Sequence, residues 1–212
     1  MADQPDLPFA CACRTVAGRL LGAGPRTGDH VVCHCTDCQA FARRFGAADR
    51  ILDANAGTAL YQTRCARMRL DTGQDRLACL HLTDKPTLRW YAACCDTPMF
   101  NTYKTGRVPY ITTLVANCDP ARRAQLGPPI GHLFTSEATG DTSHLKPMTM
   151  ASMMRRFFPR MIADIVAGDR RRSALFDTRS PSTRSRRRTH GPSDPVTPEK
   201  SGASSRQLVL RS

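Results

Sequence analysis

The densest chemical feature of the sequence is a group of three cysteines within six residues, Cys33, Cys35 and Cys38, with the spacing C-x-C-x-x-C. Side chains two residues apart on a strand point to the same face, so Cys33 and Cys35 can reach one metal while Cys38 returns to it through a tight turn. Three thiols this close together are hard to keep reduced and idle, which favours metal binding over redox-active or buried free cysteine. The geometry suits zinc.

Three thiolates are one ligand short of a closed tetrahedral site. Either a fourth ligand comes from elsewhere, or the last position is left for water or substrate, as in a catalytic zinc site. His132 and His144 are candidates for a fourth ligand or a proton carrier, although an ordinary surface or core histidine is the favoured interpretation. His34 lies between two of the cysteines and is expected to point away from them. Three thiolates also favour a sulfur or alkoxide ligand, and therefore thiol-adduct chemistry over hydrolysis.

A second group of cysteines is spread over two distant segments. Cys11 and Cys13 repeat the C-x-C pattern, and Cys94-Cys95 follow the apolar run 88–93. Ligands from a first strand and from a distant segment make a structural zinc clasp. Adjacent cysteines can both reach one metal only if the chain turns there, and residues 96–98 favour such a turn. The sequence therefore predicts two Zn²⁺ ions per chain.

The cysteines outside both groups are expected to be ordinary buried thiols: Cys65, Cys79 and Cys118.

The middle of the chain is typical of β-strands. Residues 77–82 and 87–92 are short apolar or alternating runs, and the turn-forming residues 83–86 separate them. Residues 110–116 form another run that is rich in β-branched side chains. We therefore expect a mainly β fold.

Residues 149–167 predict an amphipathic helix. Nine large apolar side chains recur at helical spacing, and Arg155, Arg156 and Arg160 are expected on the other side. Pro159 should kink or split this helix. We expect its apolar face to pack on the β-core, and binding to a membrane surface is the less favoured alternative.

Composition indicates one domain followed by a basic tail. A chain of 212 residues with 41% hydrophobic content can bury a single core, and no apolar run is long enough to span a membrane, so we expect a soluble protein. The net charge is +13, and residues 169–212 hold eleven Lys or Arg against four Asp or Glu. Such a segment cannot bury enough apolar surface to fold. We therefore predict a domain over residues 1–168 and a disordered tail over residues 169–212.

The first ten residues are rich in proline and mildly acidic, without the basic and apolar regions of a secretory signal. We therefore expect a cytoplasmic protein with reduced thiols instead of disulfides.

The order of these motifs resembles a known family. A C-x-C pair, a C-x-C-x-x-C motif about twenty residues later, and an aromatic strand with a cysteine turn before Thr97-Pro98 are similar to the glutathione-dependent formaldehyde-activating enzymes, also called the Gfa or CENP-V domain. Residues 89–98 and Asn101-Thr102 look closest to an uncharacterised branch of unknown function in that superfamily. The motifs cover roughly residues 8–118, and the overall layout extends to about 178.

The resemblance implies a mainly β, Mss4-like zinc-binding fold with one structural and one catalytic zinc. Cys33, Cys35 and Cys38 would be the catalytic ligands, and Cys11, Cys13 and Cys95 would belong to the structural site. The family usually has C-x-x-C in the aromatic turn, whereas Ala92 stands at its first position here. Cys94 must then substitute from a shifted place, or the structural site has lost a ligand.

Characterised members of that family form and break a carbon–sulfur bond between formaldehyde and glutathione, so the resemblance implies a carbon–sulfur lyase. Glutathione carries two carboxylates, and its pocket should offer cations. The basic residues nearest the metal motifs in sequence are Arg43, Arg44, Lys104 and Arg107, although any one of them is more often a solvated surface charge.

Two alternatives stay open. One is a non-catalytic, zinc-stabilised binding module whose basic tail contacts nucleic acid or another acidic partner. The tail lacks aromatic interleaving, since Phe176 is its one Phe, Tyr or Trp residue, so such contacts would be non-specific phosphate contacts. The other is a zinc enzyme that acts on a different small thiol. The sequence leaves the oligomeric state open.

Overall fold

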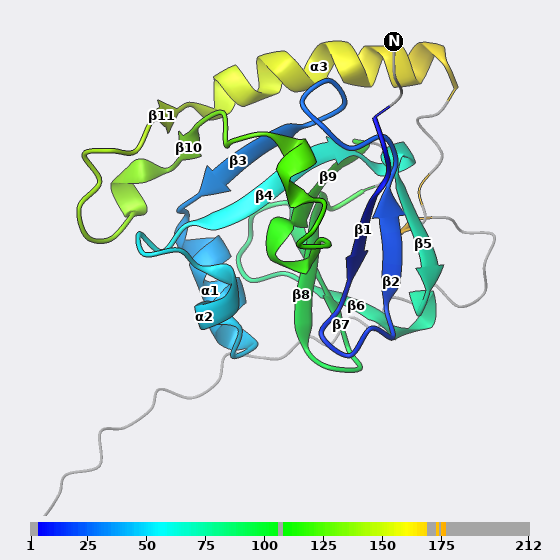
Figure 1. The fold of residues 1–212 in the computed structure, drawn as a ribbon, viewed down its shortest axis with the longest axis horizontal. Helices are drawn as coiled ribbons and strands as arrows, with labels where there is room; N and C mark the ends of the chain where they lie inside the picture. Colours follow the sequence, from blue (N-terminus) through cyan, green and yellow to red (C-terminus); the bar gives the residue numbers. More distant parts are fainter. Residues whose placement is uncertain (1–3, 106–107, 169–172, 174, 177–212) are drawn as a thin grey trace, which may run out of the picture.

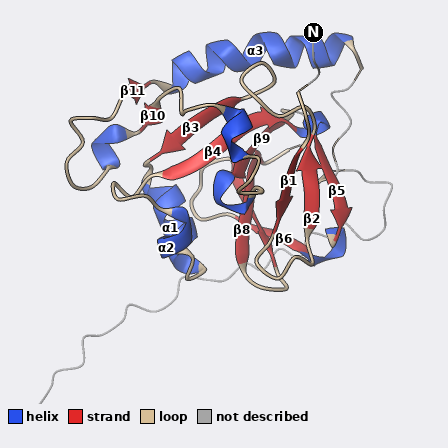
Figure 2. Ribbon diagram, viewed as in Figure 1, coloured by secondary structure: helices blue, strands red, loops and turns tan. Residues whose placement is uncertain are grey.

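The computed structural model describes residues 4–105, 108–168, 173 and 175–176 (Figure 1). Within this part of the chain, eleven β-strands form two sheets, and three α-helices and several short 3-10 turns connect them (Figure 2). The predicted mainly β fold with a helix near its C-terminal end is therefore confirmed.

The smaller sheet contains β1 (Leu7–Ala10), β2 (Ala17–Leu20) and β5 (Met68–Thr72), paired antiparallel in the order β1-β2-β5. Gly18 lies on β2 next to the backbone of β5. A Cβ atom at this position would collide with the backbone carbonyl of Arg69, so only glycine allows the two strands to approach.

The larger sheet has the strand order β11-β10-β3-β4-β9-β8-β7-β6. Its strands are antiparallel, except that β10 runs parallel to both β3 and β11. The strands predicted at 77–82, 87–92 and 110–116 correspond to β6, β7 and β9; β9 ends earlier than expected because a 3-10 turn, Val115–Asn117, follows it. The strands in sheet order are β11 (Pro147–Met148), β10 (His132–Leu133), β3 (Asp29–Cys33), β4 (Thr58–Arg64), β9 (Tyr110–Leu114), β8 (Thr97–Tyr103), β7 (Thr87–Ala92) and β6 (Leu77–Leu80).

Both faces of the larger sheet are buried, each against its own core. Tyr61 and Phe100 belong to the first core together with Phe9 of β1, so this core lies between the two sheets. Leu60, the neighbour of Tyr61 on β4, belongs to the second core together with Met153 of the C-terminal helix. Successive side chains on a strand point to opposite faces, which explains how one strand supplies both cores.

The second core is covered by helices α1 (Thr36–Arg44), α2 (Ala48–Ile51) and α3 (Met150–Val166). The helix predicted over 149–167 is thus confirmed as α3, which runs along the top of the molecule in Figure 1. Thr149 caps its start, because the Thr149 hydroxyl accepts a hydrogen bond of 3.1 Å from the Ser152 amide. Pro159 does not split α3; it is exposed, so water can solvate the carbonyl that loses its partner.

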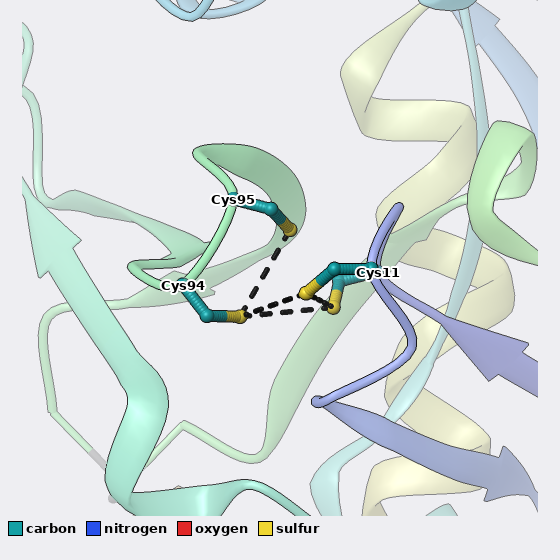
Figure 3. A group of neighbouring side chains, drawn as sticks. Cys11, Cys94 and Cys95 are labelled. Atoms are coloured by element: carbon teal, nitrogen blue, oxygen red, sulfur yellow. Dashed lines mark hydrogen bonds between the residues drawn. The ribbon is translucent and has the colours of Figure 1, made fainter.

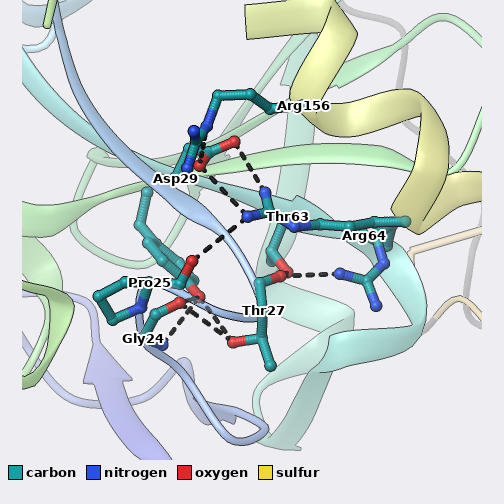
Figure 4. A network of polar contacts seen from close by, with 9 residues as sticks. Gly24, Pro25, Thr27, Asp29, Thr63, Arg64 and Arg156 are labelled. Carbon is teal, nitrogen blue, oxygen red and sulfur yellow. Dashed lines mark hydrogen bonds and ion pairs between the residues drawn. The ribbon is translucent and has the colours of Figure 1, made fainter. Parts of the chain in front are cut away.

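The orientation predicted for α3 was correct in part: Met153 and Phe157 of its apolar face are buried and Arg155 is exposed, but the two other arginines differ from the prediction. Arg156 and Arg160 were expected on the outer side, but they reach inward to the buried carboxylate of Asp29 on β3, at 2.9 Å and 2.7 Å (Figure 4). A buried carboxylate requires cationic partners, and this requirement turns the arginine face of the helix towards the sheet. Much of the apolar stripe is exposed as a result, including Phe158, Ile162, Ile165 and Val166.

Two described residues beyond α3 return to the first core. Leu175 is buried there, and the ring of Phe176 meets Trp90 edge-on with centroids 5.9 Å apart. The predicted disorder of the basic tail falls almost entirely outside the described residues. Among the described helices, none combines the length and the apolar character that crossing a membrane would need.

Candidate metal centres

The three-thiol centre, Cys33, Cys35 and Cys38, forms where β3 leads into α1. Cys33 is the last residue of β3, Cys35 is the N-cap of α1, and Cys38 lies in the first turn of that helix. The expectation that Cys33 and Cys35 share a strand was therefore wrong. The backbone amide of Cys38 donates to the carbonyl of Cys35 at 2.9 Å, so a helical turn, and not a strand turn, returns Cys38 to the other two.

The geometry of this centre fits a metal ion. The three ligand atoms lie within 4.8 Å of one another, and the Sγ atoms of Cys33 and Cys38 are 3.7 Å apart. Zinc with Zn–S bonds of the usual length would place two ligand sulfurs about 3.8 Å apart. All three residues are buried free thiols. The centre can therefore hold a metal, and its soft sulfur donors suit zinc.

No fourth ligand closes the three-thiol centre among the described residues. The group of mutually close donor atoms contains three cysteines and no histidine or carboxylate. His34 is fully buried and points elsewhere: its Nδ1 contacts the Asn55 carbonyl at 3.0 Å, and its Nε2 lies 3.1 Å from Nδ1 of His132. His144 is exposed and stands outside the group.

The three thiols share their protons unequally. Hydrogen bonds from Cys33 and Cys38 lower the pKa of the Cys35 thiol, and the same contact with Cys35 raises the pKa of Cys33. Cys35 also sits at the N-terminus of α1, where backbone amides favour a negative charge. Cys35 is therefore the first of the three to become a thiolate.

Arg89 is the main residue of this centre that the sequence reasoning missed. It lies on β7, is 5% exposed, and donates from Nη1 to Cys38 Sγ at 3.3 Å and to Asn101 Oδ1 at 3.0 Å. Burial alone would lower the pKa of Arg89, but charge interaction and hydrogen bonding with Cys38 raise it. An arginine inside the apolar run 88–93 was the available signal, because a buried charge needs a specific partner.

A second cation lies near the three-thiol centre and is paired with an acidic residue of α1. The Lys85 ammonium lies 3.0 Å from the mostly buried carboxylate of Asp37, which precedes Cys38 in α1. Nη2 of Arg89 is 3.9 Å from the same carboxylate oxygen. Asp37 therefore links the exposed Lys85 side chain to the buried Arg89.

The four-thiol centre joins two turns that are far apart in the sequence (Figure 3). Cys11 and Cys13 lie between β1 and β2, and Cys94-Cys95 lie between β7 and β8. The Sγ atom of Cys94 is 3.9 Å from that of Cys11 and 3.4 Å from that of Cys13, and the Cys11 and Cys13 Sγ atoms are 3.5 Å apart. These distances bracket the edge of about 3.8 Å expected for zinc held by thiolates. Four sulfurs complete a tetrahedral set.

The chain turns at residues 93–96, as the pair Cys94-Cys95 requires, although Thr97 and Pro98 of the predicted turn belong to β8. Asp96 adopts a left-handed backbone conformation with φ of 53°, which reverses the chain between β7 and β8. Both adjacent cysteines can then reach the same point. Cys94 supplies the fourth thiol, and Ala92 is simply a buried residue of β7.

The four-thiol centre is more accessible than the three-thiol centre. Cys13 and Cys94 are exposed, whereas Cys11 is buried against the first core. Contact with the Thr15 hydroxyl lowers the pKa of Cys13 to about 6, whereas desolvation and hydrogen bonds with Cys13 and Cys11 raise the pKa of Cys94 to about 12 although Cys94 is exposed. Of these two thiols, Cys13 therefore ionises more readily than Cys94.

The remaining predicted residues lie apart from both centres. Arg43 and Arg44 occupy the last turn of α1, and Arg43 donates to Gln39 at 3.1 Å. Lys104 is exposed just after β8, and no hydrogen bond or ion pair joins these three to the cysteines. Arg107 lies outside the described residues. As predicted, the thiols outside both centres are buried: Cys65, Cys79 and Cys118.

Comparisons with known proteins identify a family and find a solved structure of low similarity. The crystal structure of a Rhodobacter sphaeroides protein is similar, with a TM-score of 0.40 and 16% sequence identity, over 57% of this chain and 96% of that chain. The comparison with curated proteins finds no match. The sequence matches a family over residues 4–185, a range that includes all seven cysteines of the two centres. The chain therefore belongs to this family, which is described as a family of unknown function (DUF6151).

Proposed function

We propose that this protein is a zinc-dependent carbon–sulfur lyase. Its substrate would be the adduct of formaldehyde with glutathione or with a related acidic thiol. Catalysis is assigned to the three-thiol centre, and the four-thiol centre is assigned a structural role. Both centres are proposed to bind Zn²⁺.

The observation that carries this proposal is the difference in the number of ligands. Four sulfurs at Cys11, Cys13, Cys94 and Cys95 would complete a tetrahedral zinc site, whereas Cys33, Cys35 and Cys38 would leave one position open. Structural zinc sites are closed and catalytic sites keep an open position. The contrast within one chain supports one structural and one catalytic centre.

The proposed reaction needs no oxidant and releases no other product. In the forward direction the thiol sulfur bonds to the carbonyl carbon of formaldehyde, and the thiol proton ends on the carbonyl oxygen; lysis reverses both changes. Bound zinc would supply Lewis-acid polarisation of an oxygen or stabilisation of a thiolate. Cys33, Cys35 and Cys38 would hold the metal, while Arg89 and the Asp37–Lys85 pair would set the charge beside it.

Positions for the glutathione carboxylates are also proposed. Lys85 is exposed and lies next to the three-thiol centre through Asp37, so it can meet an anionic substrate there. Arg43 lies about 7.5 Å further along the axis of α1 than Cys38, at the rise of an α-helix. A tripeptide thiol is long enough to reach from the metal to such a cation.

Exchange between formaldehyde and S-hydroxymethylglutathione, followed by NMR, tests the proposal. Wild-type protein should accelerate exchange over the uncatalysed rate measured in parallel. Cys38→Ala should remove the acceleration, and Cys118→Ala should retain it, because Cys118 is a buried thiol outside both centres. Equal exchange rates for wild type, Cys38→Ala and buffer would overturn the proposal.

Burial of the three-thiol centre favours a second candidate, a zinc-stabilised binding module without catalysis. Cys33, Cys35 and Cys38 are all buried, while a substrate requires access to the open position. On this alternative the metal serves only to fix β3 to α1. The NMR experiment separates the two candidates, because a binding module leaves exchange at the uncatalysed rate while it keeps its metal.

A further inference from the structure

A row of buried polar side chains crosses the helix-covered face of the larger sheet and ends at the three-thiol centre. Its members stand directly opposite one another on neighbouring strands, and each is at most 5% exposed. In sheet order from β3 to β7 they are Asp29, Gln62, Thr112, Asn101 and Arg89. Such a row is costly to bury, so its contacts call for a specific explanation.

The end of the row holds Arg89 in one place. The Asn101 amide nitrogen donates to the Thr112 hydroxyl at 2.9 Å, which leaves the Asn101 oxygen to accept from Arg89 at 3.0 Å. The Arg89 guanidinium also lies over the ring of Phe41, 5.8 Å from its centroid. These contacts orient Arg89 without neutralising its charge.

The nearest group that can balance the positive charge of Arg89 is a cysteine sulfur. Asp37 is 3.9 Å from Arg89 and is already paired at 3.0 Å with Lys85. Cys38 Sγ is closer to Arg89, at 3.3 Å. Arg89 is therefore placed to offset the negative charge of a thiolate group in the second core.

The contact between Arg89 and Cys38 affects which fourth ligand the metal would prefer, because it changes the net charge of the centre. A divalent metal with three thiolates carries a net charge of −1, and Arg89 brings the buried group to zero. An anionic fourth ligand then leaves −1 instead of −2, while a neutral fourth ligand gains no such relief. We propose that Arg89 is the positioning residue that makes the three-thiol centre accept an anionic sulfur donor as its fourth ligand. This inference rests on the metal assignment of the proposed function, but not on lyase activity.

Ligand binding to the cobalt-substituted protein tests the inference. The probes are 2-mercaptoethanol, which binds as a thiolate, and imidazole, which binds as a neutral donor; visible absorption reports both. In Arg89→Leu the ratio of thiolate affinity to imidazole affinity should fall about tenfold or more, because a unit charge close to the ligand has been removed. Arg89→Lys keeps the charge and should keep the ratio within about threefold of wild type. Arg19→Leu, at an exposed position on β2, is the matched control and should leave the ratio unchanged.

Several results would overturn the inference. An unchanged ratio in Arg89→Leu, or an equal fall in Arg89→Leu and Arg89→Lys, would show that the charge of Arg89 does not select the ligand. Wild-type protein that binds imidazole but no thiol would contradict it without any variant, even if Arg89→Leu fails to fold. The affinity ratios could follow the expected pattern while the protein fails to accelerate formaldehyde exchange. That result would support this inference and would overturn the proposed function alone.

Discussion

Arg64 on β4 and Asp164 on α3 form a buried two-point ion pair, with Nε to Oδ2 at 2.8 Å and Nη2 to Oδ1 at 3.1 Å. Their side chains are 6% and 8% exposed. The Asp29 pairs with Arg156 and Arg160 have the opposite polarity, because there the sheet supplies the acid and the helix supplies the bases. Helix α3 is therefore held on the sheet by ion pairs of both polarities and by the buried side chains of Met153 and Phe157.

Breaking the Arg64–Asp164 pair should destabilise the protein strongly. Arg64→Met leaves Asp164 buried without its cation, and we expect a loss of about 3–5 kcal/mol in the free energy of unfolding. The double variant Arg64→Met/Asp164→Leu should recover most of it. Urea denaturation measures both. Arg19→Met, in the exposed pair with Asp71, is the control and should leave the midpoint unchanged; a loss in Arg64→Met no larger than in this control contradicts the assignment.

Leu175 should contribute to the first core although it lies beyond α3. Its side chain is buried, so Leu175→Ala removes apolar contacts and leaves a cavity. We expect the free energy of unfolding to fall by about 2–4 kcal/mol. Val166→Ala, at a position that is 83% exposed, should change it by less than about 0.5 kcal/mol. Similar small effects at both positions would mean that the chain after α3 does not pack as described.

Loss of the four-thiol centre should cost more thermal stability than loss of the three-thiol centre. Cys11 and Cys94 are 83 residues apart, so a metal between them restrains a long loop of the unfolded chain. The three-thiol centre spans six residues and restrains little. Cys13→Ser should therefore lower the melting temperature more than Cys35→Ser does. Equal shifts, measured by calorimetry on metal-loaded proteins, would argue against the clasp.

Acid should destabilise the fold partly through His132. Burial, and then the neighbouring His34, lower the pKa of His132 below its usual value near 6.5, against a smaller opposing effect of Asp53. The unfolded chain then binds this proton more readily, so stability is lost as the pH falls from about 6.5 through the lower folded-state pKa.

His132→Asn tests this pH dependence. The Asn amide can still donate to Nε2 of His34, but it does not titrate. The variant should lose less stability than wild type between pH 7.5 and pH 5.5. Both proteins carry the same cysteines, so acid-linked metal loss cancels in the comparison. Identical pH dependence would exclude a contribution from His132.

The sequence predicted the cysteine groups better than the elements that carry them. The spacing of Cys33, Cys35 and Cys38 indicated one shared centre, because three thiols within six residues can hardly avoid one another. It did not predict α1, since Cys35 begins a helix without an ordinary capping side chain. Thiol spacing constrains sulfur positions, and it leaves the backbone between them undetermined.

Long-range pairing explains the other differences. Arg89 and Cys38 are 51 residues apart, and Arg160 and Asp29 are 131 apart, so no local pattern connects them. The helical period identified α3, but it treated every arginine as an outward residue. A buried acid on another strand reversed that preference. Polar partners of this kind are set by strand order, which short sequence motifs do not encode.

Metal content tests the central claim, two zinc centres with separate ligands, most directly. Elemental analysis of purified wild-type protein should give two zinc ions per chain. Cys38→Ser and Cys94→Ser should each give one, the double variant none, and the control Cys118→Ser two, because Cys118 lies outside both groups. One zinc or less in wild type, or a content that neither single substitution changes, would contradict the account.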